Sequence, residues 1–335
     1  KEWDILHIES PVVGMSAVRS FIFMAGKPTD VISSIDISMA FLQSDSYDDN
    51  ITRYVKYKPH KYSPWRYFLL TGPIYGQRSC ARQWYDTVVK WLTEEQGYKR
   101  VNNDPNPDSQ NPNPDNNSDS GNFVRGENEP CIFVNPATGL KLLLYVDDIL
   151  CRGSVDETEK FYKALSARFD TKDPEYMELS LDRVTPENKL GFIGFDISCR
   201  KDDVTGGMVY SIDQEQYVKD LLGEYDVKRV KNIGSPMASM SVIKSDDEKL
   251  SDNDADEYRK IMGKLNYLVS TTRYDIAYSV SQCSHYTANP TVGSRRALFR
   301  ILSYLMATTD FKLEGYSTTY NTVECYSDSD FGGVK

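Results

Sequence analysis

Residues 141–151 read Lys-Leu-Leu-Leu-Tyr-Val-Asp-Asp-Ile-Leu-Cys, and this stretch decides the fold. An apolar run leads into two adjacent carboxylates, Asp147 and Asp148, and three apolar residues follow them. Aspartate is unfavourable within a strand and costly in a core. The pattern therefore predicts a hairpin whose tip presents both carboxylates to solvent or to a metal ion. A plain turn between two strands has the same pattern and is the alternative.

A second apolar strand carries one acidic residue near its end. Residues 31–37 read Val-Ile-Ser-Ser-Ile-Asp-Ile, which places Asp36 in an apolar setting. If Asp36 meets Asp147 and Asp148, the three carboxylates suit Mg²⁺, a hard ion that prefers oxygen ligands. Two such ions, roughly 4 Å apart, stabilise the attacking and leaving oxygens of an in-line phosphoryl displacement. A strand-end cap or an ion-pair partner is the alternative role for Asp36.

Hydrophobic spacing predicts the remaining elements. Helices are expected at 12–25, 79–97, 155–170 and 213–224, with a helical pair at 257–287 and 291–308. Strands are expected at 131–134 and 141–146, paired as a hairpin, then within 188–212 and at 323–327. The polar segment 101–129 cannot bury a core and is predicted to be a disordered insertion. The acidic stretch 244–256 is predicted to be a linker.

Composition limits the class of protein. A chain of 335 residues suggests two or three domains. No apolar run approaches the roughly 20 residues that a membrane span needs. Six single cysteines and three histidines argue against a structural zinc site. Because the chain begins at Lys1 rather than at a methionine, it is expected to be a fragment of a longer protein.

Charge is unevenly spread along the chain. The net charge of −10 is unfavourable for a nucleic-acid-binding protein. Arg53, Lys56, Lys58, Lys61 and Arg66 nevertheless gather among aromatic residues. Salt limits the reach of each charge to about 10 Å, so a local basic face can bind phosphates on an acidic protein. This segment is expected either to contact phosphates and bases or to be solvated surface.

Several blocks of the sequence match one family in the same order. They are Asp36-Ile-Ser-Met-Ala-Phe-Leu42, Ile74-Tyr-Gly76 with Arg82 and Trp84-Tyr85, Leu144-Tyr-Val-Asp-Asp148, Phe192-Ile-Gly194, and residues 211–218, 258–263, 267–268, 272–277 and 289–290. The blocks cover nearly the whole chain. They resemble the reverse transcriptase region of Ty1/copia-type retrotransposon Pol polyproteins.

The resemblance implies an α+β fold: a right-hand polymerase palm with a thumb and a helical connection, plus the first strand of a ribonuclease H fold. The palm with partial fingers is expected at 1–200, the thumb and acidic linker at 201–256, the connection at 257–320 and the start of the ribonuclease H domain at 321–335. Asp328, in the block 325–333, is the implied first ligand of an incomplete ribonuclease H site.

The implied activity is RNA-directed DNA synthesis, in which a dNTP gives its nucleotidyl group to a primer 3′-hydroxyl. Asp36, Asp147 and Asp148 are the implied catalytic ligands of two Mg²⁺ ions, with Mn²⁺ as an alternative. The implied substrate-binding residues are Phe41, Gln77, Arg82, Tyr145, Val146 and Lys172, and the implied primer grip is Phe192, Ile193 and Gly194.

Three of these roles have a physical rationale. A bulky ring at Phe41 against the incoming sugar would clash with a 2′-hydroxyl and so select dNTP; an ordinary core aromatic is the alternative. Gly194 would let the primer backbone approach closely. Lys172 would give a proton to the leaving pyrophosphate, with a solvated lysine as the alternative.

The resemblance also implies partners and a location. The partners are an RNA or DNA template with its primer, dNTPs, and the integrase and ribonuclease H parts of the Pol polyprotein, with no membrane. The location is a cytoplasmic virus-like particle, with the nucleus as an alternative.

Some positions depart from the family pattern and keep another hypothesis open. Ser79 stands where the family has a glutamine that contacts the nucleotide, and Ala81 replaces its proline. The basic fingers hairpin that holds the triphosphate is expected before Lys1. The alternative is therefore a degenerate element that folds and binds nucleic acid without catalysis. A third hypothesis is an unrelated metal-dependent phosphohydrolase. Under that hypothesis the order of the family blocks along the chain would be a coincidence.

Overall fold

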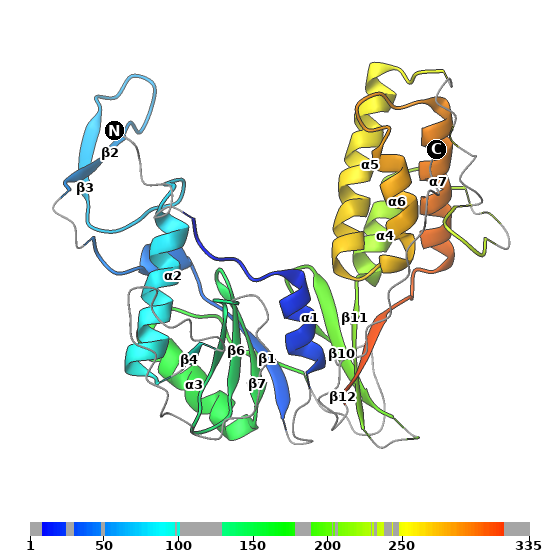
Figure 1. Ribbon diagram of the computed structural model, residues 1–335. Coiled ribbons are helices and arrows are strands. Elements are labelled where there is room, and N and C mark those ends of the chain that lie inside the picture. Colours follow the sequence, from blue (N-terminus) through cyan, green and yellow to red (C-terminus); the bar gives the residue numbers. More distant parts are fainter. Residues whose placement is uncertain are drawn as a thin grey trace, which may run out of the picture.

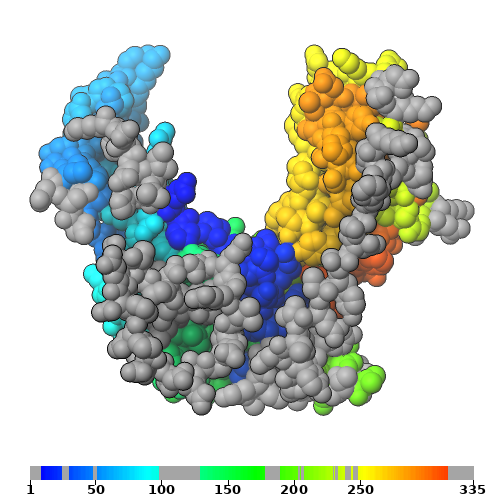
Figure 2. Space-filling view, in the orientation of Figure 1, coloured from blue at the N-terminus to red at the C-terminus, as the bar shows by residue number. Residues whose placement is uncertain are grey.

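The protein has the outline of an open U in the computed structural model (Figure 1). Its base holds two antiparallel sheets, one limb is a two-stranded hairpin and the other limb is helical. Figure 2 shows the hollow between the two limbs. The structure describes residues 9–24, 30–47, 51–97, 99–100, 129–177, 189–202, 204, 207–228, 230, 233–237, 243 and 248–317.

The larger sheet has six strands in the order β4-β5-β6-β7-β1-β8, and every pairing is antiparallel. The strands are β1 (Val31–Asp36), β4 (Lys99–Arg100), β5 (Ile132–Val134), β6 (Lys141–Tyr145), β7 (Asp148–Gly153) and β8 (Glu175–Tyr176). The predicted hairpin across 131–146 is confirmed, because Ile132 pairs with Leu143 and Val134 with Lys141.

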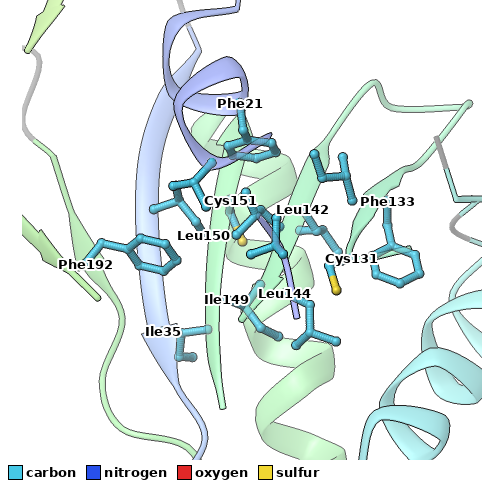
Figure 3. Packing of buried hydrophobic residues seen from close by; sticks show 14 of the residues in the cluster. Phe21, Ile35, Cys131, Phe133, Leu142, Leu144, Ile149, Leu150, Cys151 and Phe192 are labelled. Carbon is cyan, nitrogen blue, oxygen red and sulfur yellow. The ribbon is translucent and has the colours of Figure 1, made fainter. Parts of the chain in front are cut away.

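Helices cover both faces of this sheet, as two successive residues of β7 show. Cys151 pairs with Ser33 of β1, and the Ser33 hydroxyl on that face accepts a hydrogen bond of 2.8 Å from the Tyr162 hydroxyl of α3 (Val155–Arg168). Arg152 donates instead to the Phe21 and Ile22 carbonyls at the end of α1 (Met15–Phe23), at 3.3 and 2.8 Å. Successive strand residues point to opposite faces. The strand is therefore buried on both faces, and Figure 3 shows the apolar side chains packed there.

The predicted helix at 79–97 is confirmed as α2 (Cys80–Lys90), which continues as a π-helical turn, η3 (Trp91–Glu95). Its buried aromatic rings pack on those near the end of α3. The ring centroids of Trp84 and Phe169 are 5.3 Å apart, and those of Trp91 and Phe169 are 5.5 Å apart. These contacts join α2 and η3 to the end of α3.

The second sheet carries the helical limb. Its strands are β9 (Leu190–Phe192), β10 (Phe195–Lys201), β11 (Met208–Asp213) and β12 (Leu313–Ser317), in the order β12-β11-β10-β9. Between β11 and β12 the chain forms α4 (Glu215–Gly223), α5 (Asp252–Thr271), η5 (Tyr274–Ile276), α6 (Ala277–Ser284) and α7 (Val292–Ala307). These helices share one apolar core. We call residues 214–312 the helical limb.

Two predictions about this limb are wrong. The expected helix at 257–287 is two helices, because α5 ends at Thr271 and α6 begins at Ala277. Arg273 is buried in the break, where it donates to the Asp275 carboxylate and to the Thr308 carbonyl. The expected linker at 244–256 ends early, since Asp252 begins α5 and the Ser251 hydroxyl caps it by accepting from the Asp254 amide.

Contacts between the helical limb and the base are polar and specific. The Arg19 guanidinium of α1 donates to the Ser270 and Thr271 carbonyls at the end of α5, at 2.9 and 3.2 Å. The same guanidinium lies 5.0 Å from the ring centroid of Tyr274. Because a helix end carries partial negative charge, this arginine stabilises the joint.

The other limb is the hairpin of β2 (Arg53–Tyr57) and β3 (Arg66–Leu70), which form a sheet of their own. We call residues 51–70 the hairpin limb. Two sequence predictions cannot be placed: most of the insertion at 101–129, and the strand at 323–327 with Asp328, lie outside the described residues.

Candidate active site

The three aspartates lie together where β1 and β7 end. Asp36, the last residue of β1, pairs directly with Asp148, the first residue of β7. Asp147 precedes it in the turn, and its carbonyl accepts a hydrogen bond of 2.9 Å from the Ile37 amide. Residues that pair directly across an antiparallel ladder share a face. The fold therefore brings Asp36 beside the Asp-Asp turn, as the sequence predicts.

The β6–β7 turn has a strained backbone. Val146 has φ +57°, a left-handed conformation that β-branched residues rarely adopt. Its carbonyl accepts a hydrogen bond of 2.6 Å from the indole Nε1 of Trp84 in α2. Tyr145, before the turn, pairs with Asp148. A strained backbone conformation persists only where the surrounding structure stabilises it. Here the buried Trp84 side chain stabilises the conformation of Val146.

The carboxylates repel one another. Burial, together with the negative charges of Asp147 and Asp36, raises the pKa of Asp148 to about 6, although the positive charge of Lys172 opposes the rise. The Lys172 ammonium lies 3.1 Å from the Asp36 carboxylate, with two thirds of the lysine side chain exposed. One cation therefore faces three acidic groups, and the site favours further positive charge.

The donor chemistry fits a hard divalent ion, because all three side chains offer carboxylate oxygens. Their arrangement is not that of a finished ligand set. Across the described residues, no group of three or more His, Cys, Asp or Glu side chains is placed to hold a metal ion. Lys172 is paired with one oxygen of Asp36, so a metal ion at all three carboxylates requires these side chains to rearrange.

Phe41 and Gln77 both make contacts in the loop that precedes α2. Phe41, in η2 (Ala40–Gln43), packs partly against the core, and its ring centroid is 5.0 Å from that of Tyr75. The Gln77 amide oxygen accepts from the Tyr47 hydroxyl at 2.8 Å and from the Ile74 amide at 3.0 Å. Gln77 therefore uses this oxygen to shape the loop before α2.

Arg82 lies on the surface of α2 in an ion pair. Its guanidinium Nε is 3.0 and 2.8 Å from the two carboxylate oxygens of Asp86, one turn further along the helix. An exposed pair at this spacing adds about 0.3–0.5 kcal/mol. To bind a phosphate, the Arg82 guanidinium would have to give up its ion pair with Asp86.

The predicted primer-grip residues form a tight turn between β9 and β10. Phe192 is buried and its ring centroid is 6.1 Å from that of Phe195, its cross-strand partner. Ile193 and Gly194 make the turn, with φ +38° and +88°. Glycine suits such a conformation and isoleucine does not. A Cβ atom at Gly194 would also collide with the Tyr267 hydroxyl.

Side chains from the helical limb hold both carbonyls of this turn. The Tyr267 hydroxyl of α5 donates to the Ile193 carbonyl at 3.0 Å. The Gln214 amide donates to the Gly194 carbonyl at 3.3 Å, and its oxygen accepts from the Thr272 hydroxyl at 2.8 Å. Sequence reasoning assigned no role to Trp84, Gln214 or Tyr267, although each stands inside a family block.

Comparison with known proteins gives the retroelement context. No family model matches the chain. It is 29% identical over 338 residues to the retrovirus-related Pol polyprotein from transposon RE1 of Arabidopsis thaliana, which covers 99% of this chain and 20% of that protein. It is 24% identical over 351 residues to the Pol polyprotein from transposon TNT 1-94 of Nicotiana tabacum, covering 98% and 22%.

A more distant relative lies in yeast. The chain is 21% identical over 328 residues to the truncated transposon Ty1-A Gag-Pol polyprotein of Saccharomyces cerevisiae, covering 92% of this chain and 24% of that protein. The chain thus spans about a fifth to a quarter of the length of the curated relatives it matches. Its homologues are retrotransposon Pol polyproteins. Among the described helices, none has the length and hydropathy to cross a membrane.

Proposed function

We propose that this chain is the RNA-directed DNA polymerase segment of a Ty1/copia-type retrotransposon Pol polyprotein. The observation that carries the proposal is the meeting of Asp36 with the strained Asp147-Asp148 turn at one end of a buried sheet. The Pol homologues support it, because DNA synthesis on an RNA template is the chemistry that such a site would serve in a retroelement.

In this proposal the six-stranded sheet and its helices act as the palm. The second sheet and the helical limb act as thumb and connection, and the hollow between the limbs receives an RNA or DNA template with its primer (Figure 2). Other parts of the Pol polyprotein are the proposed covalent or assembled partners. Phe41 would face the sugar of the dNTP, backed by its contact with Tyr75.

The proposed reaction forms one bond and breaks another at the α-phosphorus of the dNTP. The primer 3′-oxygen attacks, pyrophosphate leaves, and the 3′-hydroxyl proton passes to solvent. Asp36, Asp147 and Asp148 would hold two Mg²⁺ ions, or Mn²⁺, which when bound supply positive charge to the attacking and leaving oxygens. Once Lys172 has left Asp36, its ammonium would protonate the departing pyrophosphate.

Primer extension tests the proposal directly. The chain is incubated with poly(rA)/oligo(dT), dTTP and Mg²⁺, beside an Asp147→Asn, Asp148→Asn variant whose circular dichroism matches the wild type. Extension by the wild type alone is expected, with the variant reduced by at least about a thousandfold. Equal extension by the two proteins would exclude these aspartates as the catalytic residues.

A degenerate fragment that binds nucleic acid without catalysis is the second candidate. Two observations favour it: Gln77 is occupied within its loop, and the aspartates are not arranged as a metal-ion ligand set among the described residues. This candidate predicts a folded protein that binds the template-primer but does not extend it. Titration with Mn²⁺ followed by electron paramagnetic resonance separates the two, because only a working site binds the ion through Asp147 and Asp148.

A further inference from the structure

The hairpin limb exposes aromatic rings on a scaffold that is too small to bury them. Tyr54 is 64% exposed, Trp65 51% and Tyr67 68%. A two-stranded hairpin is only marginally stable by itself. An exposed group of large apolar side chains marks a binding surface more often than an accident of packing. The limb therefore has the character of a docking surface.

Its charge identifies the chemistry of the partner. Residues 51–70 contain five lysines and arginines and no acidic residue, although the whole chain carries a net charge of −10. A strongly basic segment on an acidic protein favours a polyanion, because neutralised phosphates release their counterions. The same charge opposes an apolar partner and repels a second copy of the limb.

The strand register places the rings on one face of the hairpin. Lys56 pairs with Tyr67, and Tyr54 pairs with Leu69, so these four residues share one face. Trp65, two residues before Tyr67, lies on the same face, since the Lys56 ammonium is 4.7 Å from its ring centroid. Cations and rings thus alternate over one surface, which is the composition of platforms that stack bases and bind phosphates.

The spacing of the rings distinguishes a single strand from a duplex. Residues two apart on a strand are separated by roughly 7 Å. Bases within a duplex are stacked about 3.4 Å apart, so adjacent rings cannot each stack on successive paired bases. Bases of an extended, unpaired strand can meet them one by one.

We propose that the hairpin limb binds single-stranded nucleic acid through stacking on Tyr54, Trp65 and Tyr67. Lys56 and Lys58, whose ammonium groups lie 4.7 and 5.4 Å from the Trp65 ring centroid, move from the ring to the phosphates when a base takes their place. Within the proposed function, this surface would hold the unpaired part of the template. The binding itself requires neither catalysis nor metal ions.

Fluorescence anisotropy of labelled 20-nucleotide strands, without Mg²⁺ or dNTP, tests the proposal. The wild type should bind single-stranded RNA or DNA more tightly than a duplex of the same length. The Trp65→Ala, Tyr67→Ala variant should lose at least about tenfold in affinity for the single strand. Tyr278→Ala is the matched control, because Tyr278 of α6 is also 51% exposed and lies outside the hairpin limb.

Salt dependence tests the role of the lysines. Lys56→Gln, Lys58→Gln should make the slope of log affinity against log salt shallower by about 1.4, as expected for two lost phosphate contacts on a single strand. Lys260→Gln, at an exposed position of α5, should leave the slope unchanged. Circular dichroism verifies that each variant is folded.

Three results would overturn the proposal: equal affinity for single strand and duplex, equal losses in the ring variant and its control, or a ring variant that alters only the oligomeric state in sedimentation. The last result would make the limb an interface between copies of the chain. The Asp147→Asn, Asp148→Asn variant should bind single strands like the wild type. Loss of primer extension and loss of single-strand binding by the hairpin limb are therefore measured separately.

Discussion

The two strained turns of the base are held in different ways. The β6–β7 turn, with Val146 at φ +57°, is fixed by Trp84 from within the base. The β9–β10 turn, with Ile193 at φ +38°, is fixed by Tyr267 and Gln214 of the helical limb. The first turn therefore keeps its shape wherever the limb stands, whereas the second depends on the limb for its position.

Trp84→Phe should break the first turn and have the largest effect. The variant leaves the Val146 carbonyl without its indole donor and opens a gap in the aromatic contact with Phe169. The two losses together should lower the free energy of unfolding by about 3 kcal/mol. Chemical denaturation measures this loss, and primer extension should show a lower kcat with little change in the KM for primer. An unchanged kcat in the folded variant would contradict the role of Trp84 in positioning the turn.

Gly194→Ala should break the second turn, at a cost of about 2 kcal/mol. The cost has two sources, the positive φ of +88° and the collision of the new Cβ with the Tyr267 hydroxyl. A double-mutant cycle with Tyr267→Phe separates them, because removing the hydroxyl relieves only the collision. Additive effects in thermal unfolding would mean that Tyr267 does not press on this turn.

Tyr267→Phe alone should have a smaller effect, about 1 kcal/mol, because one hydrogen bond to the Ile193 carbonyl is lost while the ring remains. Its readout sharpens the comparison: the KM for primer should rise while kcat stays close to the wild type. Tyr278→Phe, at an exposed position, is the control. If kcat falls instead, the helical limb also governs the Asp-Asp turn.

A fourth effect concerns charge, because only the β6–β7 turn carries ionisable side chains. The pKa of Asp148 in the folded protein, about 6, lies above the ordinary aspartate value. The folded state therefore binds more protons than the unfolded state between pH 4 and 6, so stability falls as pH rises through this window. In EDTA, Asp148→Asn should unfold at a higher temperature than the wild type at pH 7, with the difference vanishing near pH 4. A difference independent of pH would exclude this cause.

Local patterns predicted much of the base. The apolar runs around Asp147 and Asp148 predict the β6–β7 hairpin. Both the hydrophobic pattern of the strands and the position of the turn depend on residues that are close together in the sequence. The partners of that turn could not be predicted in the same way. Trp84 reaches Val146 across 62 residues, and Tyr267 reaches Ile193 across 74. Such contacts depend on how the elements pack, which one sequence does not specify.

The break between α5 and α6 shows the same limit in a single residue. Arg273 has the charge of an exposed helical position, so the pattern at 257–287 continues through it. In the structure Arg273 is buried, because Asp275 pairs with it and the Thr308 carbonyl at the end of α7 accepts from it. The partner from α7 comes from a distant segment, and without it a buried arginine would be too costly. The interruption thus follows from a tertiary contact.

The route of the chain through the second sheet has a consequence for modularity. β11 and β12 are neighbours, and Ile212 pairs with Leu313, so the helical limb leaves the sheet and returns to it at one point. A segment whose ends lie side by side can be exchanged for another without rerouting the strands around it. A short turn joining residues 213 and 313 would close the four-stranded sheet as a simple meander. The helical limb is therefore one continuous insertion between two adjacent strands, and its replacement would leave the order of the strands unchanged.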